Sequence, residues 1–151
     1  FVVQEAREVF VIFGFETAIE CAIELGNGQR NFVDLLATRG RHTVACEVET
    51  TPRYVLTNVA KARALGLQLW VLTPNRRVMD AVTAKLRRGV GGADLAKIRI
   101  LMLGQLPQAV SKSFPTFGPA SVHANITRTD RIASATPASR RRLPNDTEPL
   151  Q

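Results

Sequence analysis

The sequence predicts an α/β fold in which a mixed central sheet is flanked by helices. Three observations carry this prediction. Apolar residues recur with the period of an α-helix in three separate stretches. Between the first two of these, three consecutive strand-like stretches are separated by tight turns. A continuous apolar run then follows at residues 67–73, which is typical of a strand covered on both faces.

A first helix is expected over residues 2–13. Apolar residues such as Ala6, Val9 and Phe13 recur there at helical spacing, and Gly14 can end the helix.

Residues 18–25 alternate between apolar and polar side chains and are predicted to form a strand. A helix is the competing interpretation, because Glu16, Glu20 and Glu24 are spaced by four, as on a helix face. We prefer the strand because a Gly-Asn-Gly sequence follows at residues 26–28, and this is a strong hairpin signal.

Two further strands are expected at residues 31–38 and 42–49, with an Arg-Gly-Arg turn at residues 39–41 between them. After Pro52 the helical period returns, and a helix is predicted over residues 53–65.

The apolar run at residues 67–73 is the next predicted strand, and Trp70 within it is assigned to the core. A helix over residues 76–88 and a last strand over residues 98–103 complete the body. The predicted order is α-β-β-β-α-β-α-β, a meander of three strands followed by a crossover to a further strand beside them.

The chain is predicted to divide into a folded α/β body at residues 1–104 and a flexible C-terminal tail at residues 105–151. Six of the eight prolines lie in the second stretch, which also shows no sustained period of a helix or strand.

The net charge of +7 favours an anionic partner, with nucleic acid the first candidate. No run approaches the roughly 18 apolar residues of a membrane span, so we expect no membrane partner. The sequence begins without a basic-then-apolar leader, and its two cysteines give no disulfide framework. We therefore expect a reducing, cytoplasmic setting.

Three acidic residues stand at special positions in the predicted sheet. Asp34 lies among apolar neighbours, where a carboxylate is costly unless it meets a cation, a donor or water. The period of a strand places Glu47 and Glu49 on one face and Val48 on the other. If the two strands pair through the turn at residues 39–41, Asp34 lies beside both glutamates. A hard divalent cation with oxygen ligands is the usual remedy for such repulsion.

This pattern resembles the PD-(D/E)XK nuclease superfamily, whose restriction-endonuclease-like fold has an αβββαβ core. The likeness covers residues 2–73 and is nearest to archaeal Holliday junction resolvases and nuclease domains of mobile elements. The Val-Asp-Leu-Leu-Ala string at residues 33–37 stands where the family has its metal-binding Asp. The Cys-Glu-Val-Glu-Thr-Thr string at residues 46–51 stands where it has its (D/E)XK strand.

The resemblance implies an endonuclease that hydrolyses DNA with Mg²⁺ or Mn²⁺. Asp34, Glu47 and the main-chain carbonyl of Val48 would then hold the metal, with Asp34, Glu47 and Glu49 as catalytic residues. Glu49 stands where the family commonly has Lys, and would act as a metal ligand or general base. Some restriction enzymes of this fold also carry Glu there.

Family members often add an acid from the first helix. Glu5 is the first candidate for this further metal ligand, with Glu8 and Glu20 as alternatives. Positive charge toward the DNA phosphates is expected from Arg53 and Lys61.

Two other functions remain open. The substitution of Glu49 for Lys also suits a catalytically inactive module that binds DNA or a partner protein within a larger machine. A structural domain whose acids are incidental is a more distant alternative. The expected DNA could be branched, and a homodimer is possible because cutting both strands needs two sites.

Overall fold

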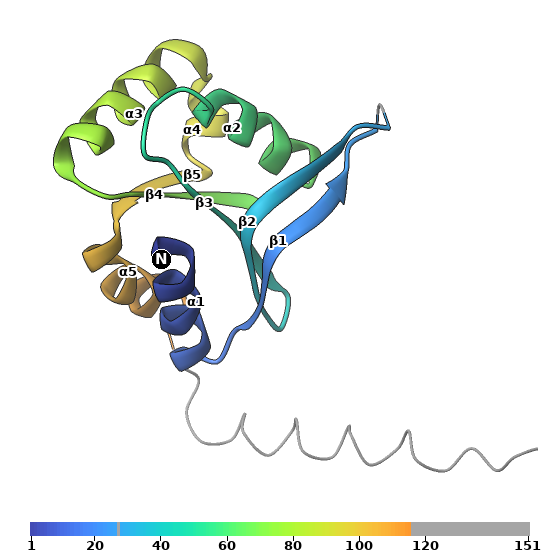
Figure 1. The fold of residues 1–151 in the computed structure, drawn as a ribbon, viewed down its shortest axis with the longest axis vertical. Helices are drawn as coiled ribbons and strands as arrows, with labels where there is room; N and C mark the ends of the chain where they lie inside the picture. The colour runs from blue at the N-terminus through green and yellow to red at the C-terminus, as the bar shows by residue number, and fades with distance from the viewer. Residues whose placement is uncertain (27, 116–151) are drawn as a thin grey trace, which may run out of the picture. The chain divides into compact units, whose positions relative to one another are not determined.

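The computed structural model describes residues 1–26 and 28–115, which form a five-stranded mixed sheet flanked by helices (Figure 1). The predicted α/β fold class is confirmed. No helix in these ranges is both long and apolar enough to cross a membrane. The elements follow one another in this order: α1 (Val2–Ile12), β1 (Glu16–Glu24), β2 (Arg30–Arg39), β3 (His42–Val48), α2 (Val55–Ala64), β4 (Gln68–Thr73), α3 (Arg76–Gly89), α4 (Gly92–Leu95), β5 (Ile98–Met102), the 3₁₀ turn η1 (Leu103–Gln105) and α5 (Leu106–Ser113).

The strands lie in the sheet in their sequence order, β1-β2-β3-β4-β5. The first three pair antiparallel, whereas β3, β4 and β5 pair parallel through helical crossovers. The predicted meander and crossover are therefore confirmed. Residues 18–25, for which a helix was the competing interpretation, lie mostly in the strand β1, which pairs with β2 from Glu16–Thr38 to Glu24–Arg30.

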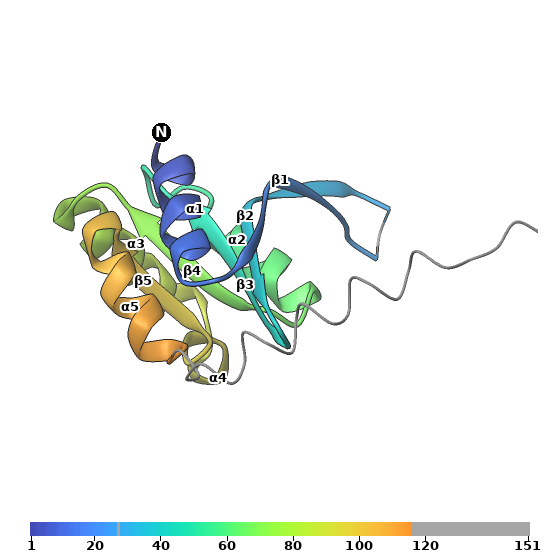
Figure 2. The same ribbon diagram turned by 90° about the horizontal axis from the view of Figure 1, so that it is seen from below.

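Helices cover the two faces of the sheet with separate apolar cores. Helices α1 and α5 pack on one face, and Figure 2 shows them together in front of the sheet. Helices α2 and α3 pack on the other face. On β4, Trp70 belongs to the first core and Val71 to the second, as the alternation of a strand requires. The assignment of Trp70 to the core is confirmed.

The folded body is longer than the sequence indicated. Its predicted end at residue 104 is wrong, because helix α5 follows and its Leu106, Val110 and Phe114 are buried in the core. Pro107 is one of the prolines on which the predicted tail rests. Proline is compatible with the first turn of a helix, and Pro107 lies in that turn. The remainder of the predicted tail, residues 116–151, lies outside the described residues.

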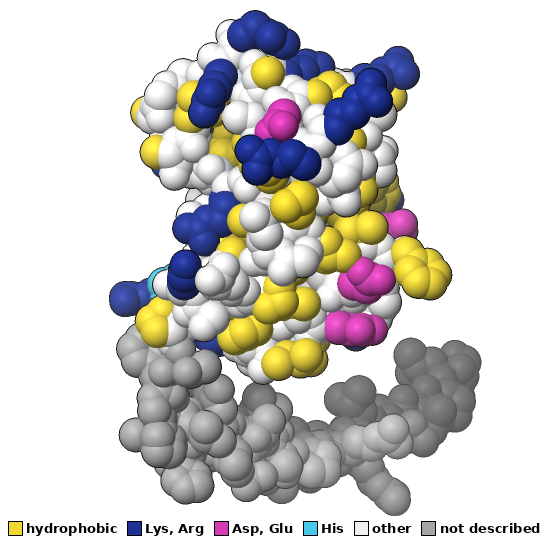
Figure 3. Space-filling view, turned by 90° about the vertical axis from the view of Figure 1, so that its left-hand side faces the viewer, with side chains coloured by type: hydrophobic (Ala, Val, Ile, Leu, Met, Phe, Trp, Pro, Cys, Tyr) yellow, Lys and Arg dark blue, Asp and Glu magenta, His cyan; other side chains and the backbone are white. Residues whose placement is uncertain are grey.

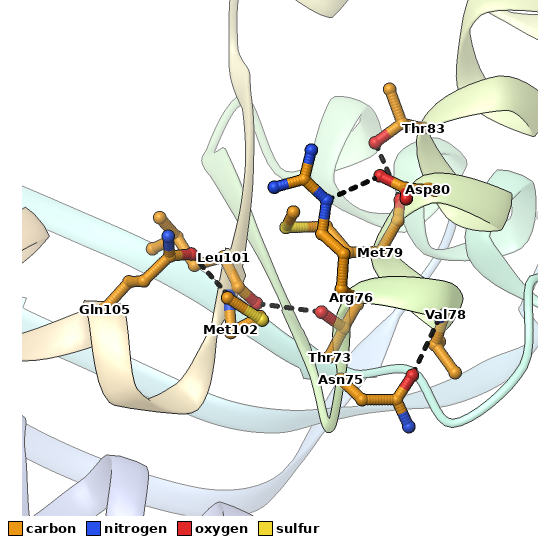
Figure 4. Close-up of polar contacts among 10 residues, drawn as sticks. All are labelled: Thr73, Asn75, Arg76, Val78, Met79, Asp80, Thr83, Leu101, Met102 and Gln105. Carbon is orange, nitrogen blue, oxygen red and sulfur yellow. Dashed lines mark hydrogen bonds and ion pairs between the residues drawn. The ribbon is translucent and has the colours of Figure 1, made fainter.

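Polar contacts hold the end of β4 next to the end of β5 and to the start of α3 (Figure 4). The Thr73 hydroxyl donates to the carbonyl of Leu101, and Asn75 caps α3 by accepting from the main-chain N–H of Val78. These contacts fix the carboxyl edge of the parallel strands, where β3 also ends.

Candidate active site

The candidate site lies where β2 separates from β3. The β2–β3 pairing runs from Arg39–His42 to Leu35–Cys46 and does not continue to Asp34. Opposite Asp34 on β1, Glu20 has a φ of +49°, a conformation that side chains rarely adopt. Asp34 bonds instead through its side chain, whose Oδ2 accepts from the main-chain N–H of Val48 at 2.8 Å. The strand therefore bends at this point and leaves its carboxylate at the fork.

Glu47 lies on the α2 face of β3 and is only 3% exposed. Its Oε1 lies 2.6 Å from Nζ of Lys61, which α2 carries toward the sheet. The ammonium of Lys61 is thus the ionic partner of this buried carboxylate oxygen. The Lys61 ammonium also donates to the main-chain carbonyl of Phe32 at 2.6 Å. One buried cation thus links β2, β3 and α2.

Glu49 follows on the same face as Glu47, as predicted, and is also buried. Its Oε1 accepts from the side-chain amide of Asn58 at 2.7 Å, and its main-chain N–H donates to Leu72 of β4. Val48 between the glutamates packs on the opposite side, against the core under α1 and α5. The predicted division of the strand between its two faces is confirmed.

Burial dominates the electrostatics of this cluster. It raises the pKa of Glu47 to about 7, aided by the negative charge of Asp34 and opposed by Lys61. Burial and Asp34 also raise the pKa of Glu49, against the opposing effect of the Asn58 hydrogen bond. The thiol of Cys46 has a raised pKa because it is buried beside the same acids. The site therefore holds carboxyl groups that exchange protons closer to neutrality than ordinary ones.

The structure brings five of the predicted site residues together: Asp34, Glu47, Val48, Glu49 and Lys61. Lys61, predicted to face the phosphate backbone, is buried inside the site rather than displayed on its surface.

Glu5 and Arg53 lie farther from the acids. Glu5 is exposed on α1, which covers the face of the sheet opposite α2, and no described contact joins it to Asp34 or Glu47. Arg53 is exposed in the loop before α2, where its carbonyl accepts from Lys85 of α3.

Asn58 is the site residue that the sequence analysis did not include. Its signal was present, because Asn58 and Lys61 are polar residues on a helix among the buried positions Val55, Val59 and Ala62. A buried polar side chain needs a partner, and here both partners are the glutamates of β3.

The donors around Asp34 and Glu47 are oxygen atoms, which suit a hard divalent cation. Within that set, Oε1 of Glu47 is already ion-paired with Lys61, so a cation there would share this oxygen with the ammonium. Across residues 1–26 and 28–115, however, no three Asp, Glu, His or Cys side chains form a group that could hold a metal ion. A ligand set at this fork would thus combine two carboxylates with main-chain oxygen.

Comparisons with known proteins find distant structural similarities and no family. No family model matches the chain, and no curated protein does. A crystal structure of a protein of unknown function, AF1548, is similar over 85% of this chain and 77% of its own, with 13% identity and a TM-score of 0.49. The small subunit of the heterodimeric restriction endonuclease R.BspD6I is similar over 84% of this chain and 86% of its own, with 10% identity and a TM-score of 0.42. Both likenesses are distant.

Proposed function

We propose that this chain is a metal-dependent endonuclease that hydrolyses phosphodiester bonds in DNA, of the resolvase or restriction-enzyme kind. One observation carries the proposal: Asp34 and the Glu47–Lys61 pair meet where β2 leaves β3. Two acids and a cation in a partly water-excluded fork are the groups that phosphodiester hydrolysis needs.

Asp34, Glu47 and the carbonyl of Val48 are the residues that would hold Mg²⁺ or Mn²⁺. When bound, such an ion polarises the phosphate and lowers the pKa of a bound water. Asp34 is already oriented by the N–H of Val48, and Glu47 by Lys61. Preorganised ligands of this kind need no rearrangement before the reaction.

Lys61 supplies the positive charge that Glu49 lacks at the family's lysine position. Its ammonium is fixed between Glu47 and the carbonyl of Phe32, so it can stabilise negative charge that develops on the phosphate. Glu49, oriented by Asn58 and with a pKa that burial raises, is suited to accept a proton from the attacking water.

Basic side chains around the site would attract the DNA backbone. Arg53 lies on the loop between Glu49 and α2, and Lys85 of α3 bonds to that loop. Further Lys and Arg side chains gather over the α3 side of the molecule (Figure 3). Contacts of this kind give affinity without reading the base sequence.

The second candidate is an inactive module of the same fold that binds DNA or a protein. The observation that favours it is the internal pairing of both glutamates, because Lys61 and Asn58 already satisfy charges that a metal would otherwise bind.

Cleavage assays on plasmid, branched and single-stranded DNA decide between the two. Wild type should cut with Mg²⁺ or Mn²⁺ and not with chelator, and Asp34→Asn and Lys61→Met should each lose at least about 100-fold in rate. Lys97→Met, at an exposed lysine, is the matched control and should retain activity. Absence of cleavage with any divalent ion, together with metal-independent DNA binding, would favour the inactive module.

A further inference from the structure

Three aromatic side chains in the described ranges are more than half exposed: Phe1, Phe32 at 52% and Tyr54 at 56%. By contrast, Trp70 and the rings around it are buried in the core under α1 and α5. Phe32 is connected to the candidate site through its main-chain carbonyl, and Tyr54 directly precedes the helix that carries Asn58 and Lys61. Their exposure contributes little to the stability of the fold, because the free-energy gain from an aromatic ring comes from burying it.

Phe32 is tied to the site through its main chain. Its carbonyl accepts from Lys61, whose ammonium contacts Glu47, and each contact is 2.6 Å long. The next residue, Val33, packs into the core under α2. Neighbouring side chains of a strand point to opposite faces, so the ring of Phe32 lies on the outer face of the β1–β2 hairpin. The β1–β2 hairpin thus carries the ring of Phe32, and the main chain of Phe32 is linked through Lys61 to the carboxylate of Glu47.

Tyr54 is attached to the site from the α2 side. It directly precedes α2, and one turn later Asn58 donates to Glu49. The guanidinium of Arg53 lies 5.2 Å from the centre of the Tyr54 ring, a cation–π contact that holds a positive charge beside the aromatic surface. Tyr54 and Arg53 therefore place an exposed ring and a positive charge side by side.

We propose that Phe32 and Tyr54 stack on unpaired nucleobases, and that the substrate at this site is DNA whose bases are unpaired beside the phosphate to be cut. This inference rests on the proposed function and names its substrate class. Exposed rings beside a cation are the means by which proteins hold single strands, because every base presents a face for stacking. In a continuous duplex those faces are already covered by neighbouring bases, so the rings would find no partner.

The test is DNA binding by the full chain in chelator, where no cleavage can occur. Fluorescence anisotropy would compare a single strand, the matching duplex and a fully paired four-way junction. Wild type should bind the single strand most tightly. Phe32→Ala should weaken that binding about 10-fold and duplex binding less than about 2-fold, and Tyr54→Ala should act in the same direction. Phe32→Trp should retain wild-type affinity, because a larger ring still stacks.

Two controls isolate stacking from charge and folding. Ile12→Ala removes an exposed apolar side chain on α1 and should leave all three affinities unchanged. Phe32→Ala should leave the dependence of affinity on salt unaltered, whereas Arg53→Ala should reduce it, since only the second removes a phosphate contact. A melting temperature of Phe32→Ala equal to that of wild type would confirm an intact fold.

The inference is overturned if the duplex or the junction binds as tightly as the single strand, or if Phe32→Ala binds single strands like wild type. Its failure is distinguishable from failure of the proposed function. Metal-dependent cutting of duplex DNA by both wild type and Phe32→Ala would preserve the nuclease and remove the stacking role. Single-strand binding that depends on Phe32, without cleavage in the presence of any divalent ion, would preserve the stacking role and remove the nuclease.

Discussion

The two sides of strand β3 differ in kind. Cys46 and Val48 face α1 and α5, where Phe10, Trp70 and Phe114 pack with ring centroids up to 5.8 Å apart. On the other side, at the end of the same strand, Glu47 and Glu49 face α2 and are buried among polar partners. A single strand thus serves an apolar core and a charged site.

The side chains on one side of β3 stabilise the fold, whereas those on the other side form the candidate site. Burying apolar rings lowers the free energy of the folded state, whereas burying a carboxylate raises it unless a partner compensates. The raised pKa of Glu47 is the measure of that cost, because the folded protein disfavours the ionised form. Both faces of the sheet therefore stabilise the fold through apolar cores, whereas the carboxylates buried under α2 raise the free energy of the folded state unless their partners compensate.

Removing α5 should cause the largest loss of stability among the changes that test the two sides of β3. A chain that ends at Gly104 loses the buried Leu106, Val110 and Phe114, and each buried side chain of this size contributes about 2–5 kcal/mol. We expect a protein without a cooperative thermal transition, measured by circular dichroism. A chain that ends at Pro115 is the control and should melt like the full chain. An unchanged melting temperature of the shorter chain would contradict the assignment of α5 to the core.

The next effect tests the charged side. Lys61→Met leaves the buried Glu47 without its cation, which should cost about 3 kcal/mol of unfolding free energy at pH 8. The loss should be smaller at pH 5.5, where Glu47 is protonated and needs no cation. Urea unfolding at both pH values measures it, with the exposed Lys97→Met as control. Equal losses at the two pH values would show that Lys61 acts through packing alone.

The pH dependence of stability tests the cost of burying the ionised carboxylate of Glu47. The folded pKa of Glu47, about 7, lies above its ordinary value of 4.5, so the folded state binds the extra proton between these values. Wild-type stability in chelator should therefore fall as pH rises from about 4.5 to about 7, by at most about 3 kcal/mol, and change little above. The double variant Glu47→Gln with Lys61→Met should show a smaller slope, since the proton uptake of Glu47 is removed. An unchanged slope would place the titration elsewhere.

The smallest effect concerns Asn58. Asn58→Ala removes the hydrogen bond to Glu49 and leaves a buried carboxyl without that donor, at an expected cost of about 2 kcal/mol. Thr57→Ala, exposed on the same helix, should change stability by less than about 0.5 kcal/mol. If the two variants melt alike, Asn58 does not support the site.

Most of the fold could be predicted from the sequence, and the part that was predicted wrongly has an identifiable physical cause. The helices and strands of the body follow from periodicity, including β1, where the Gly-Asn-Gly signal correctly outweighed the spacing of the glutamates. Helix α5 was missed because it is short and contains Pro107, whose position in the first turn is visible only once the helix is known. Within the site, alternation was enough to put Glu47 and Glu49 on one face, but it could not identify Asn58 as a partner.

Local order along the chain was determined by the sequence itself, because hydrophobic period and turn residues act over a few neighbours. The pairing of Glu47 with Lys61 and of Glu49 with Asn58 was decided only by tertiary structure. These contacts exist because the parallel crossover from β3 to β4 lays α2 on one particular face of the sheet. The end of the β2–β3 pairing beside Asp34, across the hairpin from the positive φ of Glu20, is likewise visible only in the tertiary structure. The same acids on an exposed strand would be ordinary solvated carboxylates, and burial beneath α2 is what raises the pKa of both glutamates.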